Sequence, residues 1–137
     1  MQFASLNGLT IGKCTRWSIG ERQIEIDQAY WQDPTTTENE KISLIFHELG
    51  HCDLNRNHDE SLRQDGYPKS LMCPYNLSFF DEESEYYYAE LFGRDTSNLL
   101  PVLSLSSKAV DTDHTRARTL RSRRTVITQP DSRSQAG

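Results

Sequence analysis

The sequence predicts a small α+β domain in which a short β-hairpin or sheet packs on one helix. Three observations predict it. Two short strand-like stretches come first, at 10–17 and 22–27. A capped helical segment follows at about 38–54, and a second one runs from Asp81 toward Gly93. Strands followed by helices within one short chain are typical of α+β folds.

Composition divides the 137-residue chain into two unlike parts. All 13 aromatic residues lie at or before Phe92. Residues 1–101 carry a net charge of −9, and residues 102–137 carry +4 and are rich in Ser, Thr and Arg. A stretch without aromatic anchors cannot bury enough apolar surface to fold. We therefore predict one domain over 1–100 and a basic, disordered tail over 101–137.

The mean hydropathy and the net charge of the chain exclude two classes of protein. Mean hydropathy is −0.72, and no stretch approaches the roughly 20 apolar residues that span a bilayer. The net charge of −5 has the wrong sign for a surface that grips phosphate backbones. We therefore expect no membrane partner and no nucleic-acid partner, apart from the weak possibility offered by the arginines of the tail. Nothing in the sequence predicts an oligomeric state.

The three cysteines, Cys14, Cys52 and Cys73, are an odd number without paired spacing. We expect no disulfide framework and at most one bridge, and free thiols fit a reducing compartment. The first residues lack both a basic and an apolar region, so no signal peptide is visible. The expected location is intracellular by default, or secreted if the chain derives from a longer precursor.

The first elements are predicted from alternation and capping. Ile24 and Ile26 alternate with polar neighbours, and residues 18–21 join this strand to the preceding one, which predicts a hairpin. Thr37 stands three residues before Glu40, the spacing of a capping box, so a helix is predicted to start there. It should end among residues 55–57, where asparagines tolerate the left-handed conformation.

A projection of this first helix at 100° per residue separates two faces. The apolar side chains gather on one of them, which we expect to face the core: Ile42, Ile45, Phe46, Leu49 and Cys52. His47 and His51 lie nearly opposite. The second helix is predicted to begin with Asp81 as N-cap, followed by glutamates that suit the positive end of the helix dipole.

Residues 47–51 form an H-E-x-x-H motif inside the first predicted helix. Two histidines four positions apart lie one turn apart on the same face, where both imidazoles can bind one zinc ion. Glu48 lies beside them, so it is better placed to take a proton from a zinc-bound water than to bind the metal. The motif predicts a catalytic zinc site with His47 and His51 as ligands and Glu48 as general base.

A catalytic zinc ion needs a third protein ligand and one open position. His58 is the first candidate, because it follows the segment that should end the helix and turn the chain back. The alternative is a carboxylate from the second helix: Glu82, Glu83, Glu85 or Glu90. The only other histidine, His114, lies in the tail.

The stretch from His47 to Asp59 resembles the metzincin zinc peptidases. It is similar to their pattern H-E-x-x-H-x-x-G-x-x-H-D, with one extra residue before the third histidine. Residues 70–75, Ser-Leu-Met-Cys-Pro-Tyr, look like the family's Met-turn, with Met72 as its methionine. Leu54 stands where the family has a glycine, so Asn55 or Asn57 must provide the bend. Tyr75 follows Met72 by three positions rather than the two of several metzincins.

This resemblance implies an abbreviated metzincin-like domain and a zinc-dependent metalloendopeptidase that acts on a protein or peptide substrate. It implies zinc held by His47, His51 and His58, with water activated by Glu48. Two alternatives stay open. One is a zinc peptidase with a carboxylate third ligand, as in cytosolic regulatory peptidases. The other is a non-catalytic module in which zinc only staples a small fold.

Overall fold

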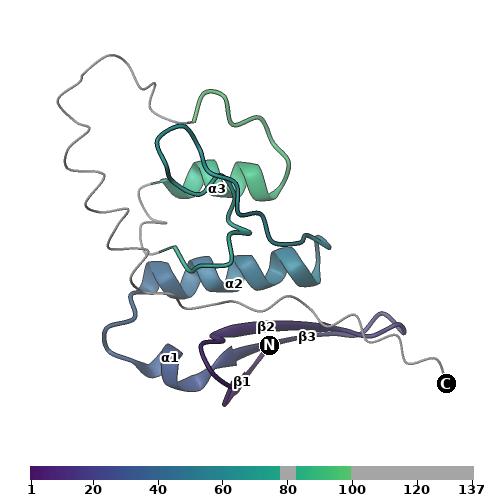
Figure 1. Cartoon of the computed structure of the whole chain (residues 1–137). Coiled ribbons are helices and arrows are strands. Elements are labelled where there is room, and N and C mark those ends of the chain that lie inside the picture. The colour runs from purple at the N-terminus through teal and green to yellow at the C-terminus, as the bar shows by residue number, and fades with distance from the viewer. Residues whose placement is uncertain (78–82, 100–137) are drawn as a thin grey trace.

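The computed structural model describes residues 1–77 and 83–99. Its elements form three layers, which Figure 1 shows one above another. A small sheet forms the first layer, the long helix α2 (Glu38–Cys52) the second, and the loop after α2 together with helix α3 (Ser84–Leu91) the third. The α+β class predicted from the sequence is confirmed. Because α2 lies between two layers, both of its sides are covered.

The sheet has three strands in the order β1-β3-β2, namely β1 (Gln2–Ala4), β2 (Gly12–Arg16) and β3 (Arg22–Asp27). β2 and β3 form the predicted antiparallel hairpin, with Cys14 opposite Ile24. The strict alternation of β3 buries Ile24 and Ile26 on the side of α2. β1 runs parallel to β3 and was not predicted, because three residues are too few to show a period.

Two helices begin at side-chain caps. Helix α1 (Gln28–Gln32) is a single short turn whose N-cap Asp27 accepts from the backbone N–H of Tyr30, and the sequence analysis missed it. The capping box of α2 is confirmed, because Thr37 and Glu40 each accept from the other's backbone N–H. After α2, Asn55 has a φ of 55°, so Asn55 makes the left-handed bend that the absent glycine would otherwise provide.

A first group of buried side chains, the sheet-side cluster, fills the space between the sheet and α2: Ile11, Cys14, Ile24, Ile26, Leu44 and Cys52. Within it, a disulfide joins Cys14 of β2 to Cys52, the last residue of α2, with Cα atoms 5.6 Å apart. This bridge agrees with the expected maximum of one, whereas the expectation of free thiols is wrong for these two cysteines and correct for the buried Cys73. Their spacing of 38 residues carries no local signal, since only the packing of α2 on β2 brings them together.

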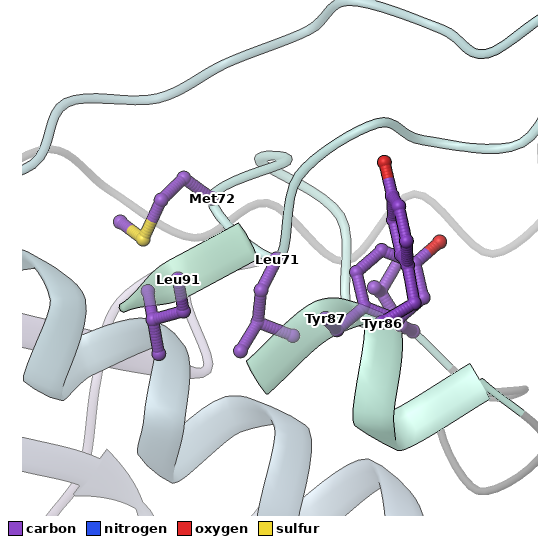
Figure 2. Close-up of a cluster of buried hydrophobic side chains, with 6 residues drawn as sticks. Leu71, Met72, Tyr86, Tyr87 and Leu91 are labelled. Carbon is purple, nitrogen blue, oxygen red and sulfur yellow. The ribbon is translucent and has the colours of Figure 1, made fainter. Parts of the chain in front are cut away.

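A second group, the turn-side cluster, packs on the other side of α2: Leu71, Met72, Leu77, Tyr86, Tyr87 and Leu91. In the view of Figure 2, Leu71 lies between Leu91 and the two tyrosine rings. The hydroxyl groups of Tyr86 and Tyr87 donate to the carbonyls of Lys69 and Pro68. α3 is thereby fastened to the loop that leads into the turn at Met72.

The predicted faces of α2 need a correction. Ile42, assigned to the core face, is 38% exposed, and Ile45 is only half-buried. The buried residues are instead Ser43, Leu44, His47, Glu48, Gly50, His51 and Cys52. The projection assumed one covered side, whereas α2 is covered by the sheet on one side and by the turn-side cluster on the other. Polar motif residues are therefore buried, and the most apolar side is only partly covered.

Two sequence predictions fall partly or wholly outside the described residues. The disordered tail at 101–137 lies outside them, and so does Asp81, the predicted N-cap of the second helix. α3 has Glu83 at its N-cap position without a side-chain cap, and Gly93 follows its end with a φ of 66°. Within the described part of the chain, no helix is long and apolar enough to cross a membrane.

Removing the disulfide should destabilise the fold. For a loop closed over 38 residues, the chain-entropy model gives about 4 kcal/mol. We expect the double variant Cys14→Ala/Cys52→Ala to lose about this much free energy of unfolding, measured by urea denaturation. Cys73→Ala is the control, since it should keep the sensitivity of the wild type to a dithiol reductant. Equal stability of the wild type with and without reductant would contradict the bridge.

Candidate metal centre

His47 lies in the middle of α2 and is only 1% exposed. Its Nδ1 lies 2.8 Å from the carbonyl oxygen of Leu71, in the turn that Ser70 opens. A carbonyl can only accept, so this contact places the ring proton on Nδ1 and leaves a lone pair on Nε2. The Nε2 atom therefore faces the other two histidines as a potential ligand atom.

His51 repeats this arrangement one turn later. It is fully buried, and its Nδ1 donates to the carbonyl of Arg56 across 2.7 Å. Its Nε2 lies 3.0 Å from Nε2 of His47. Protein ligands of zinc commonly donate their second ring N–H to a backbone carbonyl in this way, which fixes both tautomer and ring orientation.

His58 comes from the loop beyond Asn55 and completes the group. Its Nε2 lies 3.3 Å from Nε2 of His47, and one ring nitrogen from each histidine falls within 4.8 Å of the others. The neighbouring Asp59 donates its backbone N–H to the carbonyl of Met72, which ties this loop to the turn. Among the described residues, these three histidines are the only group of three His, Cys, Asp or Glu side chains arranged to hold a metal ion.

Burial keeps the three imidazoles neutral. It is the main reason why the pKa of His47 falls to about 3, with a further contribution from the charge of His51. Burial likewise lowers the pKa of His51 to about 4, helped by His58 and by the guanidinium of Arg16. The pKa of His58 is also lowered by burial. Neutral imidazole is the form that binds metal ions, so the ligands are ready at neutral pH.

Glu48 is fully buried beside the histidines, on the side of α2 that faces β2. Its carboxylate lies so close to Gly12 that a Cβ there would be 2.3 Å from Oε1. Neither oxygen has a hydrogen-bond partner within the described residues, and burial raises the pKa of the carboxyl to about 8. A buried carboxylate without a partner is costly, which is typical of a group that acts on a ligand or on water.

The chemistry of this donor set fits a divalent transition metal. Three imidazole nitrogens converge, two of them oriented by backbone carbonyls, and a carboxylate without a partner is buried next to them. Three protein ligands leave one coordination position open, as catalytic zinc sites require. The residues present therefore fit the ion that the motif predicts.

Among the described residues, two of the rival carboxylate ligands are paired with arginines and a third is exposed. Glu83 forms an ion pair with Arg63, and Glu90 forms one with Arg56. Glu85 is exposed to solvent, and Glu82 lies outside the described residues. The geometry thus favours His58 as third ligand. Tyr75, whose role the sequence left open, is 42% exposed.

Sequence reasoning missed the residues that support the site. Gly50, between the two motif histidines, leaves room for the thioether of Met72, and a Cβ there would lie 2.4 Å from the sulfur. Gly12 does the same for Glu48. A glycine inside a helix costs about 1 kcal/mol relative to alanine, so Gly50 was a visible signal of close packing. Arg56 gave no such signal, because its partners are distant in the sequence.

The fold and the site together define a metallopeptidase-like α+β domain. A family model described as "Putative phage metallopeptidase" matches residues 12–101. This match covers β2, β3, α2, α3 and all three clustered histidines, and the chain belongs to that family. Comparisons with curated proteins and with solved structures gave no match. Membership supports a peptidase that depends on a metal ion.

Gly50→Ala should lower stability although alanine favours a helix. The gain in helix propensity is about 1 kcal/mol, whereas forcing a methyl group into a packed core costs about 1 to 3 kcal/mol. Because Met72 is fully buried, it cannot move aside freely, and we expect a net loss in urea denaturation. The double variant Gly50→Ala/Met72→Ala should be less destabilised than the sum of its singles. Strict additivity would contradict this contact.

Proposed function

We propose that the protein is a zinc-dependent endopeptidase of metzincin type. One observation carries this proposal: three neutral imidazoles converge beside a buried carboxylate without a partner, in a chain of a metallopeptidase family. Further support comes from the turn at Met72, which packs against α2 at Gly50, and from helix α3, which follows this turn in the sequence. Both features are similar to the metzincin plan.

Zinc is the proposed ion because of the donor atoms. Imidazole nitrogens suit zinc, copper, iron and nickel, whereas magnesium and calcium prefer oxygen ligands. Three histidines with an open fourth position are the arrangement of catalytic zinc sites. His47, His51 and His58 would hold the ion. When bound, zinc supplies Lewis-acid chemistry, since it lowers the pKa of water to about 7 and polarises a carbonyl group.

Glu48 is proposed as the general base. Its side chain is buried on the side of α2 toward Gly12. In its ionised form, the raised pKa makes it a stronger base than an ordinary carboxylate. It would take a proton from the attacking water and then deliver it to the nitrogen of the leaving amine. Burial excludes competing solvent from this transfer.

The proposed substrate is an extended protein or peptide segment. β2 stands at the edge of the sheet order β1-β3-β2, and its first residue, Gly12, contacts Glu48. A peptide that adds a strand along this edge would run past the general base. The edge of β2 is therefore the proposed docking line for substrate.

Glu48→Gln should abolish cleavage while leaving zinc bound. Loss of a general base costs about 10²- to 10⁴-fold in rate, whereas glutamine keeps the shape of the side chain and the three histidines stay intact. The measurements are cleavage of an unstructured protein substrate, with and without a chelator, and zinc content by elemental analysis. Full cleavage activity in this variant would exclude Glu48 as the base, whereas a wild type that binds zinc but cleaves no substrate would favour a non-catalytic zinc module.

His58→Ala should separate the two possible ligand sets. With three histidine ligands, zinc affinity should fall by more than the roughly 10- to 100-fold that loss of an outer partner costs. His114→Ala is the control variant, since His114 lies outside the region that the family model matches. The zinc affinity of this variant should equal that of the wild type. An unchanged affinity in His58→Ala would point to a carboxylate ligand instead.

A further inference from the structure

The main chain of Arg56 organises the end of the motif helix. Directly after the left-handed bend at Asn55, its N–H donates to the carbonyl of Gly50 across 2.9 Å. Its own carbonyl accepts from Nδ1 of His51. The backbone of this one residue therefore sets the orientation of the His51 ring.

The side chain of Arg56 fastens this stretch of backbone to α3. Its Nη1 donates to the carbonyls of Glu90 and Leu91, at 3.1 and 3.3 Å. Its Nη2 forms an ion pair with Oε1 of Glu90 at 2.5 Å. The planar fork of an arginine can make these contacts together, whereas a lysine ammonium cannot.

The second oxygen of Glu90 holds the other loop of the site. Ser70, which is fully buried, donates its hydroxyl to Oε2 of Glu90 at 2.8 Å and accepts from the N–H of Met72. Between them lies Leu71, whose carbonyl accepts from Nδ1 of His47. One carboxylate thus binds both segments whose carbonyls orient the motif histidines.

We propose that Arg56, Glu90 and Ser70 are positioning residues of the metal centre. This inference rests on the proposed function, because it concerns how the zinc ligands are oriented. The two acceptors of the histidine Nδ1 protons lie in segments outside helices and strands, at residues 56 and 71, which the Asp59–Met72 backbone hydrogen bond also links. The Glu90 carboxylate has a fixed spacing between its oxygens, so together with the Asp59–Met72 hydrogen bond it fixes the distance between the two segments. Glu90 serves the metal site from outside and is not a ligand.

The same helix offers a matched control. Glu83, just before α3, pairs with Arg63, whose side chain is 6% exposed. The Arg56–Glu90 pair is similarly shielded, with side chains 26% and 16% exposed. Both pairs fasten α3 to loops, but within the described residues the hydrogen bonds of Glu83 go to Arg63 and not to a segment whose carbonyl accepts from a motif histidine. If both ion pairs only stabilised the fold, breaking either pair would affect zinc binding equally.

The test compares Glu90→Gln with Glu83→Gln in the full-length chain. We expect Glu90→Gln to weaken zinc binding by about 10- to 100-fold, the usual effect of losing an outer partner of a metal ligand. The visible absorption spectrum of the Co²⁺-loaded protein should also change, because it reports ligand geometry. Glu83→Gln should lower the unfolding temperature yet leave zinc affinity and the Co²⁺ spectrum as in the wild type.

Arg56→Lys distinguishes positioning from direct ligation by Glu90. It keeps the charge and loses the fork, so positioning predicts an altered Co²⁺ spectrum and a loss of zinc affinity. The double variant Arg56→Lys/Glu90→Gln should lose little more than either single, because the residues act as one unit. If Glu90 were a ligand, Glu90→Gln would weaken zinc binding far more than Arg56→Lys, because only Glu90→Gln would remove a donor atom from the metal.

Two kinds of failure are distinguishable. Wild-type zinc affinity and Co²⁺ spectrum in Glu90→Gln would overturn the positioning role while the wild type still binds zinc and cleaves peptides. A wild-type chain that binds no zinc would overturn the proposed function and this inference together. Equal effects of Glu83→Gln and Glu90→Gln on the spectrum would reduce both pairs to general supports of the fold.

Discussion

The structure depends on the burial of a polar helix. α2 carries His47, Glu48 and His51 into a space covered by the sheet on one side and by the turn-side cluster on the other. Buried polar groups must find partners, because an unsatisfied one costs about 1 to 3 kcal/mol. Both histidines find a loop carbonyl for Nδ1. Their Nε2 atoms are thereby turned toward each other and toward His58.

This constraint explains why the loops around α2 are held so firmly. The loop bearing His58 is joined to the turn by Asp59 and Met72, and the turn is joined to α3 through Ser70 and Glu90. The disulfide fixes the end of α2 to the sheet next to His51. A small domain with little core gains rigidity from such specific links, which a metal site needs to keep its geometry.

The two glycines near the site show how close packing and chemistry are combined. Gly12 lets the edge strand approach the Glu48 carboxylate, and Gly50 lets the Met72 thioether approach the helix between the histidines. In both places a side chain would occupy space that a site residue uses. Because of the disulfide, the expectation of a reducing compartment, which rested on free thiols, now rests on Cys73 alone.

By itself, the sequence determined what depends on neighbours in the chain. The hairpin, the capping box of α2 and the spacing of His47 and His51 are local patterns, and they were predicted because backbone periodicity acts over a few residues. The tertiary structure alone decided the disulfide, the buried faces of α2 and the Arg56–Glu90–Ser70 group. The residues bonded in the disulfide and in this group lie 14 to 38 positions apart. Whether such residues meet depends on how the layers pack, which no local pattern encodes.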